Sequence, residues 1–338
     1  MDIRQLRYFV AIVGQGSFSR AAAHLHVAQP ALSLHVRNME ADLGTPLLFR
    51  TPKGVVPTEA GEILLRHART ILDQFTIAEE EIRGHSSEPS GEVRLGLPGT
   101  ISENLSVALI IALHKRHPAI RLRIAEAMSG FVLDWMRTAQ IDLAVVYREI
   151  TDQGLATVHL LDEELVFFAP ADVGSVPGLD ALPLPPVGGN LPLAALSSVP
   201  LVLPGEAHGL RELINQEACA AGVCLQVGIE VDAYSNIKQL VVTGFGCSVL
   251  PLNAIRSEID QGLVRFWHIS APSIRRSVHL ASSVERPATN ATAAVHALVQ
   301  EVLREKVQTG GWLGATLPSS DKAAATDPAQ GVQASPIR

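Results

Sequence analysis

The segment from 28 to 40, AQPALSLHVRNME, combines side chains that can read the edge of a base pair. The amide of Gln29 can make a bidentate contact to adenine, the hydroxyl of Ser33 can bond to base edges, and Pro30 can pack on the methyl group of thymine. The mixture of Glu and Lys that is usual on a solvated helix face is missing here. This combination favours contact with nucleic acid over simple exposure to water, which stays the alternative for each residue.

Helical periodicity decides which side of this segment points outward. Pro30 suits the first turn of a helix, where its missing N–H costs nothing. A predicted buried stripe of apolar side chains follows at helical spacing, comprising Leu32, Val36, Met39 and Leu43. The outward face then carries Gln29, Pro30, Ser33, Leu34 and Arg37. For Arg37 an ion pair with Glu40, one turn further along the helix, is an alternative role.

Two short helices and a hairpin surround this segment. Apolar spacing predicts a helix over 3–13, the glycines of GQGS end it, and Ser17 caps a short Ala-rich helix over 18–25. After the third helix, LLFRTPKGVVPT reads as a hairpin whose tip carries Arg50 and Lys53, which suit phosphates or the minor groove. We therefore predict a winged helix-turn-helix domain over 1–58, with the helix-turn-helix at about 18–37 and Ser19 as a further DNA contact.

The charge distribution agrees with a head that meets a polyanion. Residues 1–70 hold eight Lys and Arg against five Asp and Glu, a balance of +3. The remaining residues carry 19 against 29, a balance of −10. A weakly basic head on an acidic body indicates that the head alone contacts DNA.

A long helix over 59–85 follows the wing and carries a heptad seam. Its apolar side chains recur in steps of four and three, at Leu64, Ala68, Ile71, Phe75, Ala78 and Ile82. The predicted helix exceeds what a small domain needs, so we expect dimerisation through this seam, with packing against the body of the same chain as the alternative. Residues 86–91 form the predicted hinge.

The remainder, 92–308, alternates apolar strands with helices, which is typical of parallel sheets in α/β proteins. Lobe one is predicted over about 92–161 and 267–308, and lobe two over about 162–266, so that the two make a clamshell. We interpret 171–199, rich in Pro, Gly, Leu and Ala, as a surface loop. The tail over 309–338 lacks periodicity and is expected to be disordered.

The clamshell is expected to bind a small molecule between its lobes. Gly99, Thr100 and Ser102 follow the first strand and open a helix, where free N–H groups and hydroxyls suit a carboxylate. Three further candidates also stand at helix starts, namely Ser129, His208 and Asn236. At each position an ordinary helix cap is the alternative.

The sequence lacks the signature motifs of several classes of enzyme. It has no nucleophile elbow, no phosphate-binding loop and no dinucleotide fingerprint, so we predict no enzyme and no cofactor. Its three cysteines form no CxxC pair. His24 with His26, and His114 with His117, have spacings that could suit a metal, but no carboxylates or HExxH motif surround them, so solvated or capping histidines are the interpretation and no metal is expected. We find neither a signal peptide nor an apolar run long enough to span a membrane, which predicts a cytoplasmic protein without membrane contact.

The order of winged helix, long helix and two-lobed domain resembles the LysR-type transcriptional regulators. The resemblance covers residues 1 to about 306 and is most specific over the first 72. Within it, AQPALS and LLFRTPKGVVPTEAG look most like the branch of nitrogen assimilation control regulators, and IDLAVVY and VTGFGCSVLP are looser landmarks. One departure is Leu34, where the family usually has arginine; Leu34 either touches a thymine methyl or faces the groove wall.

The resemblance implies a fold that is α/β overall, with a periplasmic-binding-protein-like C-terminal domain. It further implies a regulator that binds a dyad-symmetric operator in double-stranded DNA as a dimer or a tetramer, either as activator or as repressor. A small effector, expected to be a carboxylate, and RNA polymerase are its implied partners. The alternative function is a solute-binding or metabolic enzyme domain with an accessory winged helix, which would not need paired heads.

Overall fold

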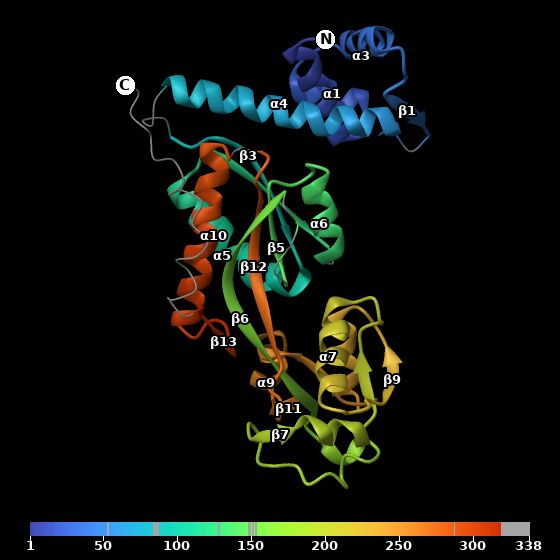
Figure 1. Ribbon diagram of the computed structural model, residues 1–338, viewed down its shortest axis with the longest axis vertical. Helices are drawn as coiled ribbons and strands as arrows, with labels where there is room; N and C mark the ends of the chain where they lie inside the picture. Colours follow the sequence, from blue (N-terminus) through green and yellow to red (C-terminus); the bar gives the residue numbers. More distant parts are fainter. Residues whose placement is uncertain are drawn as a thin grey trace, which may run out of the picture.

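The computed structural model describes residues 1–52, 54–83, 88–127, 129–147, 150, 152, 154–286 and 288–318, without the side chains of Glu81, Arg83 and Ser129. Figure 1 shows three parts in a row, with the N-terminal head beside a long helix, lobe one below that helix and lobe two at the far end. The predicted class, α/β with an N-terminal winged helix-turn-helix, is confirmed.

The head follows the predicted order of three helices and a hairpin. These elements are α1 (Ile3–Gln15), α2 (Phe18–Leu25), α3 (Gln29–Leu43), β1 (Leu48–Thr51) and β2 (Gly54–Pro57). Asp2 and Gln5 form a capping box at α1, and Ser17 accepts a hydrogen bond from the N–H of Arg20 to cap α2. Leu32, Val36 and Met39 are buried as predicted, whereas Leu43 is 47% exposed because α3 ends there and Gly44 turns the chain away.

Close backbone contacts fix the hairpin on the helix-turn-helix. The N–H of Val55 donates to the carbonyl of Gly16 over 2.9 Å. Gly54 has φ +131°, and a Cβ there would lie 2.5 Å from the same carbonyl oxygen, so this position requires glycine. The wing therefore has a defined place beside the turn between α1 and α2.

The long helix α4 (Glu59–Arg83) starts in the head and runs along one side of lobe one (Figure 1). Thr58 caps it, because its hydroxyl oxygen accepts from the N–H of Gly61 and donates to the carbonyl of Pro46. Leu64, Leu65 and Ala68 are buried against Leu6 and Phe9 of α1. The first half of α4 thus belongs to the hydrophobic core of the head. Of the predicted hinge, residues 86 and 87 lie outside the described residues, and Gly91 already begins a strand.

Lobe one consists of parallel strands covered by helices. Its elements are β3 (Gly91–Leu97), α5 (Gly99–Arg116), β4 (Ile120–Glu126), α6 (Ser129–Arg137), β5 (Leu143–Val146) and the returning helix α10 (Asn290–Gln308). β3 pairs in parallel with β4 and with β5. Helices α5 and α10 lie on one face of the sheet and α6 on the other (Figure 1).

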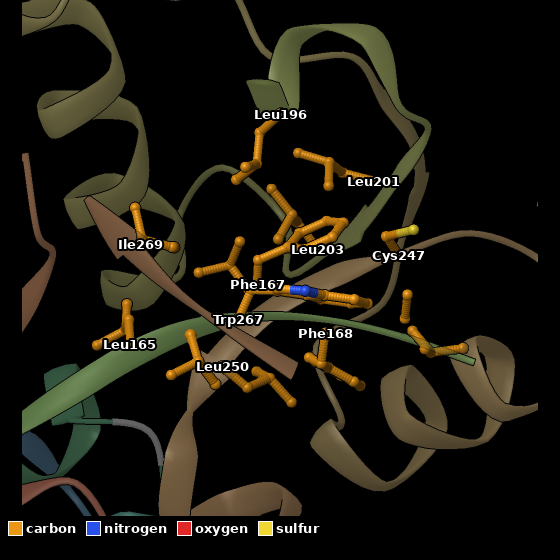
Figure 2. Packing of buried hydrophobic residues seen from close by; sticks show 14 of the residues in the cluster. Leu165, Phe167, Phe168, Leu196, Leu201, Leu203, Cys247, Leu250, Trp267 and Ile269 are labelled. Carbon is orange, nitrogen blue, oxygen red and sulfur yellow. The ribbon is translucent and has the colours of Figure 1, made fainter. Parts of the chain in front are cut away.

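Two long antiparallel strands, β6 (Leu155–Pro170) and β12 (Arg275–Ser283), connect the lobes. β6 pairs with β12 over its first half and with β10 (Ser248–Pro251) and β11 (Val264–Ser270) over its second half. The remaining elements of lobe two are η1 (Val173–Ser175), β7 (Asn190–Pro192), η2 (Leu193–Ser198), β8 (Leu201–Leu203), α7 (Gly209–Ala220), β9 (Val227–Glu230), α8 (Tyr234–Val242), η3 (Leu252–Ile255) and α9 (Arg256–Asp260). Its core surrounds Phe167 and Trp267, with Leu203 and Leu250 beside them (Figure 2).

Two predictions about lobe two need correction. Strand β11 continues to Ser270 and buries Trp267 and Ile269 in lobe two, and Ile274 still belongs to the same core, so the chain returns to lobe one eight residues later than predicted. The predicted surface loop, 171–199, contributes to the same core through six buried residues, Val176, Leu179, Leu191, Leu193, Leu196 and Val199. Its apolar side chains have no regular period because it follows short 3-10 turns instead of a long element.

The predicted tail is folded in its first ten residues. Residues 309–318 follow α10 and contain the short strand β13 (Ala315–Thr316), which pairs with Asp162 and Glu163 of β6. In the same segment, Trp312 is 2% exposed. A single buried Trp and a two-residue strand leave no periodicity for a sequence analysis to find. Residues 319–338 lie outside the described residues.

Candidate DNA-binding face and inter-lobe site

The predicted reading side chains lie together on the outer face of the helix-turn-helix. Gln29, Pro30, Leu34 and Arg37 of α3 are exposed, and Leu34 is 52% exposed. Ser33 is half-buried, and Ser19 of α2 is exposed. Because α3 is held from behind by Leu32, Val36 and Met39, this face has a fixed orientation relative to the wing.

The structure bears on the alternative role considered for Arg37, an ion pair with Glu40. The Nε of Arg37 donates to the carbonyl of Ser33 over 3.3 Å, which leaves the guanidinium on the outer face. Glu40 instead accepts from the N–H groups of Leu47 and Leu48 with one carboxylate oxygen, over 2.8 and 3.3 Å. The carboxylate of Glu40 therefore fixes the start of the wing, in place of the alternative ion pair with Arg37.

On the wing, Arg50 is exposed and its guanidinium lies 4.8 Å from the ring centre of Phe18. This cation–π contact holds a positive charge next to α2 without neutralising it. The second predicted wing contact, Lys53, lies outside the described residues.

The predicted dimerisation seam divides into two halves with different environments. Leu64 is 9% exposed and Ala68 is fully buried, because both pack inside the head. Ile71, Phe75 and Ile82 are 41%, 39% and 85% exposed, and Ala78 is exposed as well. The prediction of one continuous seam is thus wrong for its first two members, whereas the last four form an exposed apolar stripe.

A second side of α4 contacts lobe one. Nη1 of Arg69 donates to the carbonyl of Ala139 over 2.7 Å, and a carboxylate oxygen of Glu80 accepts from the N–H of Asn290 over 3.0 Å. Asp73 lies 3.8 Å from Nη1 of Arg286. The alternative that the sequence left open, packing of α4 against the body of its own chain, therefore applies to this side of the helix.

These contacts join a buried cluster of charges. Arg94 of β3 forms a two-point pair with the carboxylate of Asp142, over 3.0 and 2.5 Å, and Nη1 of Arg286 lies 3.5 Å from the same carboxylate. Burial and then the neighbouring Arg94 lower the pKa of Arg69 to about 10. Burial and then the negative charge of Asp142 raise the pKa of Asp73 from 3.8 to about 6, although Arg94, Arg286 and Arg69 oppose the rise.

The raised pKa of Asp73 predicts a pH-dependent stability. The folded chain retains a proton on Asp73 between its ordinary pKa of 3.8 and about 6, where the unfolded chain releases it. This contribution therefore falls as the pH rises through that window and is constant above it. We expect Asp73→Asn, which mimics the protonated form, to be more stable than the unaltered chain at about pH 7.5 and to keep only about half of that advantage at about pH 5, because pH 5 lies in the middle of the window. Urea unfolding at both pH values measures the difference.

Asp134→Asn is the matched control for this experiment, because Asp134 is 66% exposed in its pair with Arg137. Its stability difference from the unaltered chain should not grow with pH. If Asp73→Asn were destabilised equally at both pH values, the ion pair with Arg286 would outweigh the burial of the carboxylate, and the predicted direction would be wrong.

Between the lobes, polar side chains from both sides meet at the strands that connect them. Thr100 at the start of α5 hydrogen-bonds to the hydroxyl of Tyr147, which follows β5. The guanidinium of Arg276 in β12 lies 3.5 Å from the ring centre of Tyr147, and its Nη1 donates to the hydroxyl of Tyr234 over 3.4 Å. The ring of His208 lies 5.8 Å from that of Tyr234. Thr100 and His208, far apart in sequence, thus belong to one inter-lobe group.

The electrostatics of this group centre on Arg276. Arg276 and Glu163 are each 3% exposed, and one oxygen of Glu163 accepts from Nε and Nη2 of Arg276 over 3.2 and 2.6 Å. Burial raises the pKa values of Tyr147 and Tyr234 and lowers the pKa of His208. At neutral pH the group therefore offers neutral hydroxyls, a neutral imidazole and one paired guanidinium.

The other predicted effector residues have more ordinary environments. The Nδ1 of His208 accepts from the N–H of Leu210, so this residue also caps α7. Ser102 hydrogen-bonds to Ser106 along α5 over 3.0 Å. Gly99 lies beside Glu126, Asn236 is exposed, and the side chain of Ser129 is outside the described part.

A cavity of about 410 Å³ adjoins this group between α5 of lobe one and α8 and α9 of lobe two. Asn104, one of its lining residues, donates to the carbonyl of Thr100 over 2.7 Å. Lys238 lines the opposite wall and pairs with Glu258 over 3.0 Å. The lining residues are Glu103, Asn104, Lys238, Asn253, Ala254, Arg256, Ser257, Asp260 and Gln261. Because both lobes form its walls, a bound molecule here would contact both.

Tyr147, Glu163, Tyr234 and Arg276 are not among the site residues predicted from the sequence. A signal was present, since Glu163 and Arg276 interrupt apolar strands that must be buried, and a buried charge requires a partner. Among the described residues, no helix is long and apolar enough to cross a membrane, and no three potential metal ligands cluster.

Comparison with known proteins gives a matching family model for each of the two parts of the chain. Residues 3–62 match the family model described as bacterial regulatory helix-turn-helix protein, lysR family, and residues 86–304 match the model of the LysR substrate binding domain. The nitrogen assimilation regulatory protein nac of Klebsiella aerogenes is 31% identical over 283 residues, which cover 83% of this chain and 88% of that protein. The protein of the same name from Escherichia coli strain K12 is 30% identical, and the matched region covers 91% of this chain and 97% of that protein.

Solved structures agree with the fold. A full-length OxyR variant from Pseudomonas aeruginosa superimposes with a TM-score of 0.72 at 26% identity, covering 90% of this chain and 98% of that one. CbnR, solved in complex with its target DNA, has a TM-score of 0.52 at 22% identity, and the match covers 90% of this chain and 100% of that one. These relatives are transcriptional regulators and not enzymes, in agreement with the sequence.

Proposed function

The chain belongs to the LysR family of transcriptional regulators, and on this basis we propose that it binds a dyad-symmetric operator as a dimer or tetramer and responds to a small anionic metabolite between its lobes. The outer face of α3, which presents Gln29, Ser33 and Arg37 beside the basic wing, is the observation that carries this proposal. Such a face suits the major groove. A location in the cytoplasm is part of the proposal, because the matched family consists of bacterial regulators and bacterial DNA lies in the cytoplasm. Contact with RNA polymerase is part of the proposal because the family consists of transcriptional regulators.

Exposed apolar surfaces support the proposed assembly. The stripe of Ile71, Phe75, Ala78 and Ile82 on α4 would pair two heads for two half-sites. On α5, Val107, Ile110 and Ile111 are 67%, 50% and 51% exposed. A second apolar surface of this kind would join two dimers into a tetramer.

Recovery of genomic DNA bound to the full chain, followed by sequencing, tests the proposed DNA recognition. We expect enriched fragments to share a site with dyad symmetry, because two heads related by a two-fold axis bind two half-sites. The genes beside these fragments would also indicate the pathway. Fragments recovered without a shared sequence would contradict operator recognition and favour an enzyme domain with an accessory winged helix.

Thr100→Val tests the proposed effector response. Valine keeps the shape of threonine and removes the hydroxyl that bonds to Tyr147 at the start of α5. We expect basal DNA binding to stay unchanged and the melting temperature to fall, because the partly buried hydroxyl of Tyr147 loses this partner, while the further stabilisation by a small acid is lost. Succinate, benzoate and glutamate are the first probes, added to both proteins in a thermal melt.

Ser106→Ala is the matched control, because it also removes one hydroxyl from α5. This hydroxyl lies one turn beyond Ser102 and forms a hydrogen bond with the hydroxyl of Ser102. If no acid of a broad panel stabilises the unaltered chain, the effector part of the proposal fails, and control through the abundance of the protein becomes the better explanation. DNA recognition is tested separately and would not be affected.

A further inference from the structure

The C-terminal segment, defined as residues 309–318, reaches the connection between the two lobes. After α10 of lobe one, Gly310 and Gly311 lie against Arg256 of α9, whose Nη1 is 3.5 and 3.4 Å from their carbonyl oxygens. The N–H of Leu313 then donates to Asn253 over 3.0 Å. The segment therefore leaves lobe one and contacts lobe two.

The same segment is bound to both connecting strands. The carbonyl of Gly314 accepts from the N–H of Glu164 in β6 over 2.9 Å, and the hydroxyl of Thr316 accepts from Arg275 in β12 over 3.0 Å. Gly314 has φ +69°, and a Cβ there would lie 3.1 Å from that of Leu252, so a larger residue would be strained. The segment thus has one defined path across the strands between the lobes.

Along this path Trp312 meets the buried ion pair. Its indole Nε1 donates to Oε1 of Glu163 over 3.0 Å, while Oε2 of Glu163 accepts from both Nε and Nη2 of Arg276. All three side chains are at most 3% exposed. Each oxygen of the carboxylate therefore has its own partner, and the indole N–H keeps one of them turned away from the guanidinium.

We propose that Trp312 is a positioning residue of the effector site: acting through Glu163, it holds the guanidinium of Arg276 between the lobes. Arg276 in turn stacks on Tyr147 of lobe one and donates to Tyr234 of lobe two. The C-terminal segment is thereby part of the sensing machinery. This inference rests on the proposed effector response, since Arg276, although buried and paired, contacts the two tyrosines of the inter-lobe group in which that response is placed.

Trp312→Phe tests the inference, because phenylalanine keeps an aromatic side chain and removes the indole N–H. Oε1 of Glu163 then lacks the indole N–H as a donor, and the smaller ring leaves room for water beside this oxygen. The ion pair between Glu163 and Arg276 therefore opens more often. We expect modification of Arg276 by phenylglyoxal, followed by peptide mass spectrometry, to become about fivefold faster or more. This measurement needs no effector, so it is independent of whether any acid binds.

Trp267→Phe is the matched control. Trp267 is 1% exposed in the core of lobe two, and its Nε1 donates to the carbonyl of Pro185 over 2.8 Å, away from Glu163. Its loss should destabilise lobe two without changing the reactivity of Arg276. If both variants accelerated the reaction equally, general loosening would explain the result and the inference would be overturned.

A double-variant comparison tests whether the effect passes through Glu163. Glu163→Gln leaves an acceptor for Trp312 and removes the negative charge that faces Arg276, so it should accelerate the modification of Arg276 by itself. In that background, Trp312→Phe should add less than about twofold, because coupled residues are not additive. A full additional effect would mean that Trp312 acts independently of Glu163 and would contradict the inference.

The effector response supplies a second readout. For any of succinate, benzoate and glutamate that stabilises the unaltered chain, Trp312→Phe should weaken binding by about fivefold or more, and Trp267→Phe should not. Equal affinities of the two variants would overturn the role in sensing. Absence of binding to the unaltered chain would count against the proposed effector response, while the modification rates still decide the positioning of Arg276.

Discussion

Replacing both Ile71 and Phe75 by Asp should weaken operator binding by about 10²–10⁴-fold, because two linked heads bind two half-sites with a large effective concentration and a single head does not. Both side chains belong to the exposed stripe of α4, at 41% and 39% exposure. In a helix pair both positions would be buried, and a carboxylate buried in an apolar seam is costly even where a cation lies nearby. The mass in sedimentation should fall at least twofold.

The fold of the head should survive these substitutions. The core of the head uses Leu64, Leu65 and Ala68 of α4, which precede the stripe. Arg7 lies 5.6 Å from the ring of Phe75, so an Asp at that position would face a cation within its own chain.

Val187→Asp is the matched control, because Val187 is 54% exposed and shortly precedes β7, a strand of lobe two that lies at the opposite end of the molecule from α4 (Figure 1). Unchanged assembly and unchanged operator affinity of the double variant would show that the heads pair elsewhere.

The head was the part of the fold that its sequence predicted most closely. Its contacts are local, and the apolar spacing of Leu32, Val36 and Met39 alone orients α3. Leu43 was the exception, because periodicity cannot tell where the last turn leaves the core. The seam failed for a related reason: spacing identifies an apolar face, but Leu64 and Ala68 had a partner within the head.

The inter-lobe site could be predicted only in part. Thr100 and His208 were identified because each stands at a helix start, which is a local feature. Arg276 and Glu163 are 113 residues apart, and their pairing depends on the register of β6 against β12. Trp312 is 149 residues from Glu163, in a segment without periodicity. Such contacts follow from the topology of the sheet, which no local pattern encodes.

Recognition of the operator should depend on Gln29 in a way that differs in kind from its dependence on Arg50. Gln29 is exposed at the start of α3, where a side-chain amide can bond to adenine with about 1–3 kcal/mol of discrimination, or about 5- to 150-fold. Arg50 offers a charge to phosphate or the minor groove with little sequence preference. The two substitutions by Ala therefore separate reading of sequence from attraction to DNA.

We expect Gln29→Ala to weaken binding to the operator far more than to scrambled DNA, with a nearly unchanged dependence on salt. Arg50→Ala should weaken both about equally and reduce the slope of log K against log salt concentration by up to about one. Titrations of both variants on operator and scrambled duplexes at several salt concentrations measure this, and thermal melts check that loss of the contact with Phe18 leaves the head folded. If Gln29→Ala lowered both affinities equally, α3 would position the protein on DNA while other residues read the sequence, and Ser33 and Leu34 would be the next candidates because they share the same face.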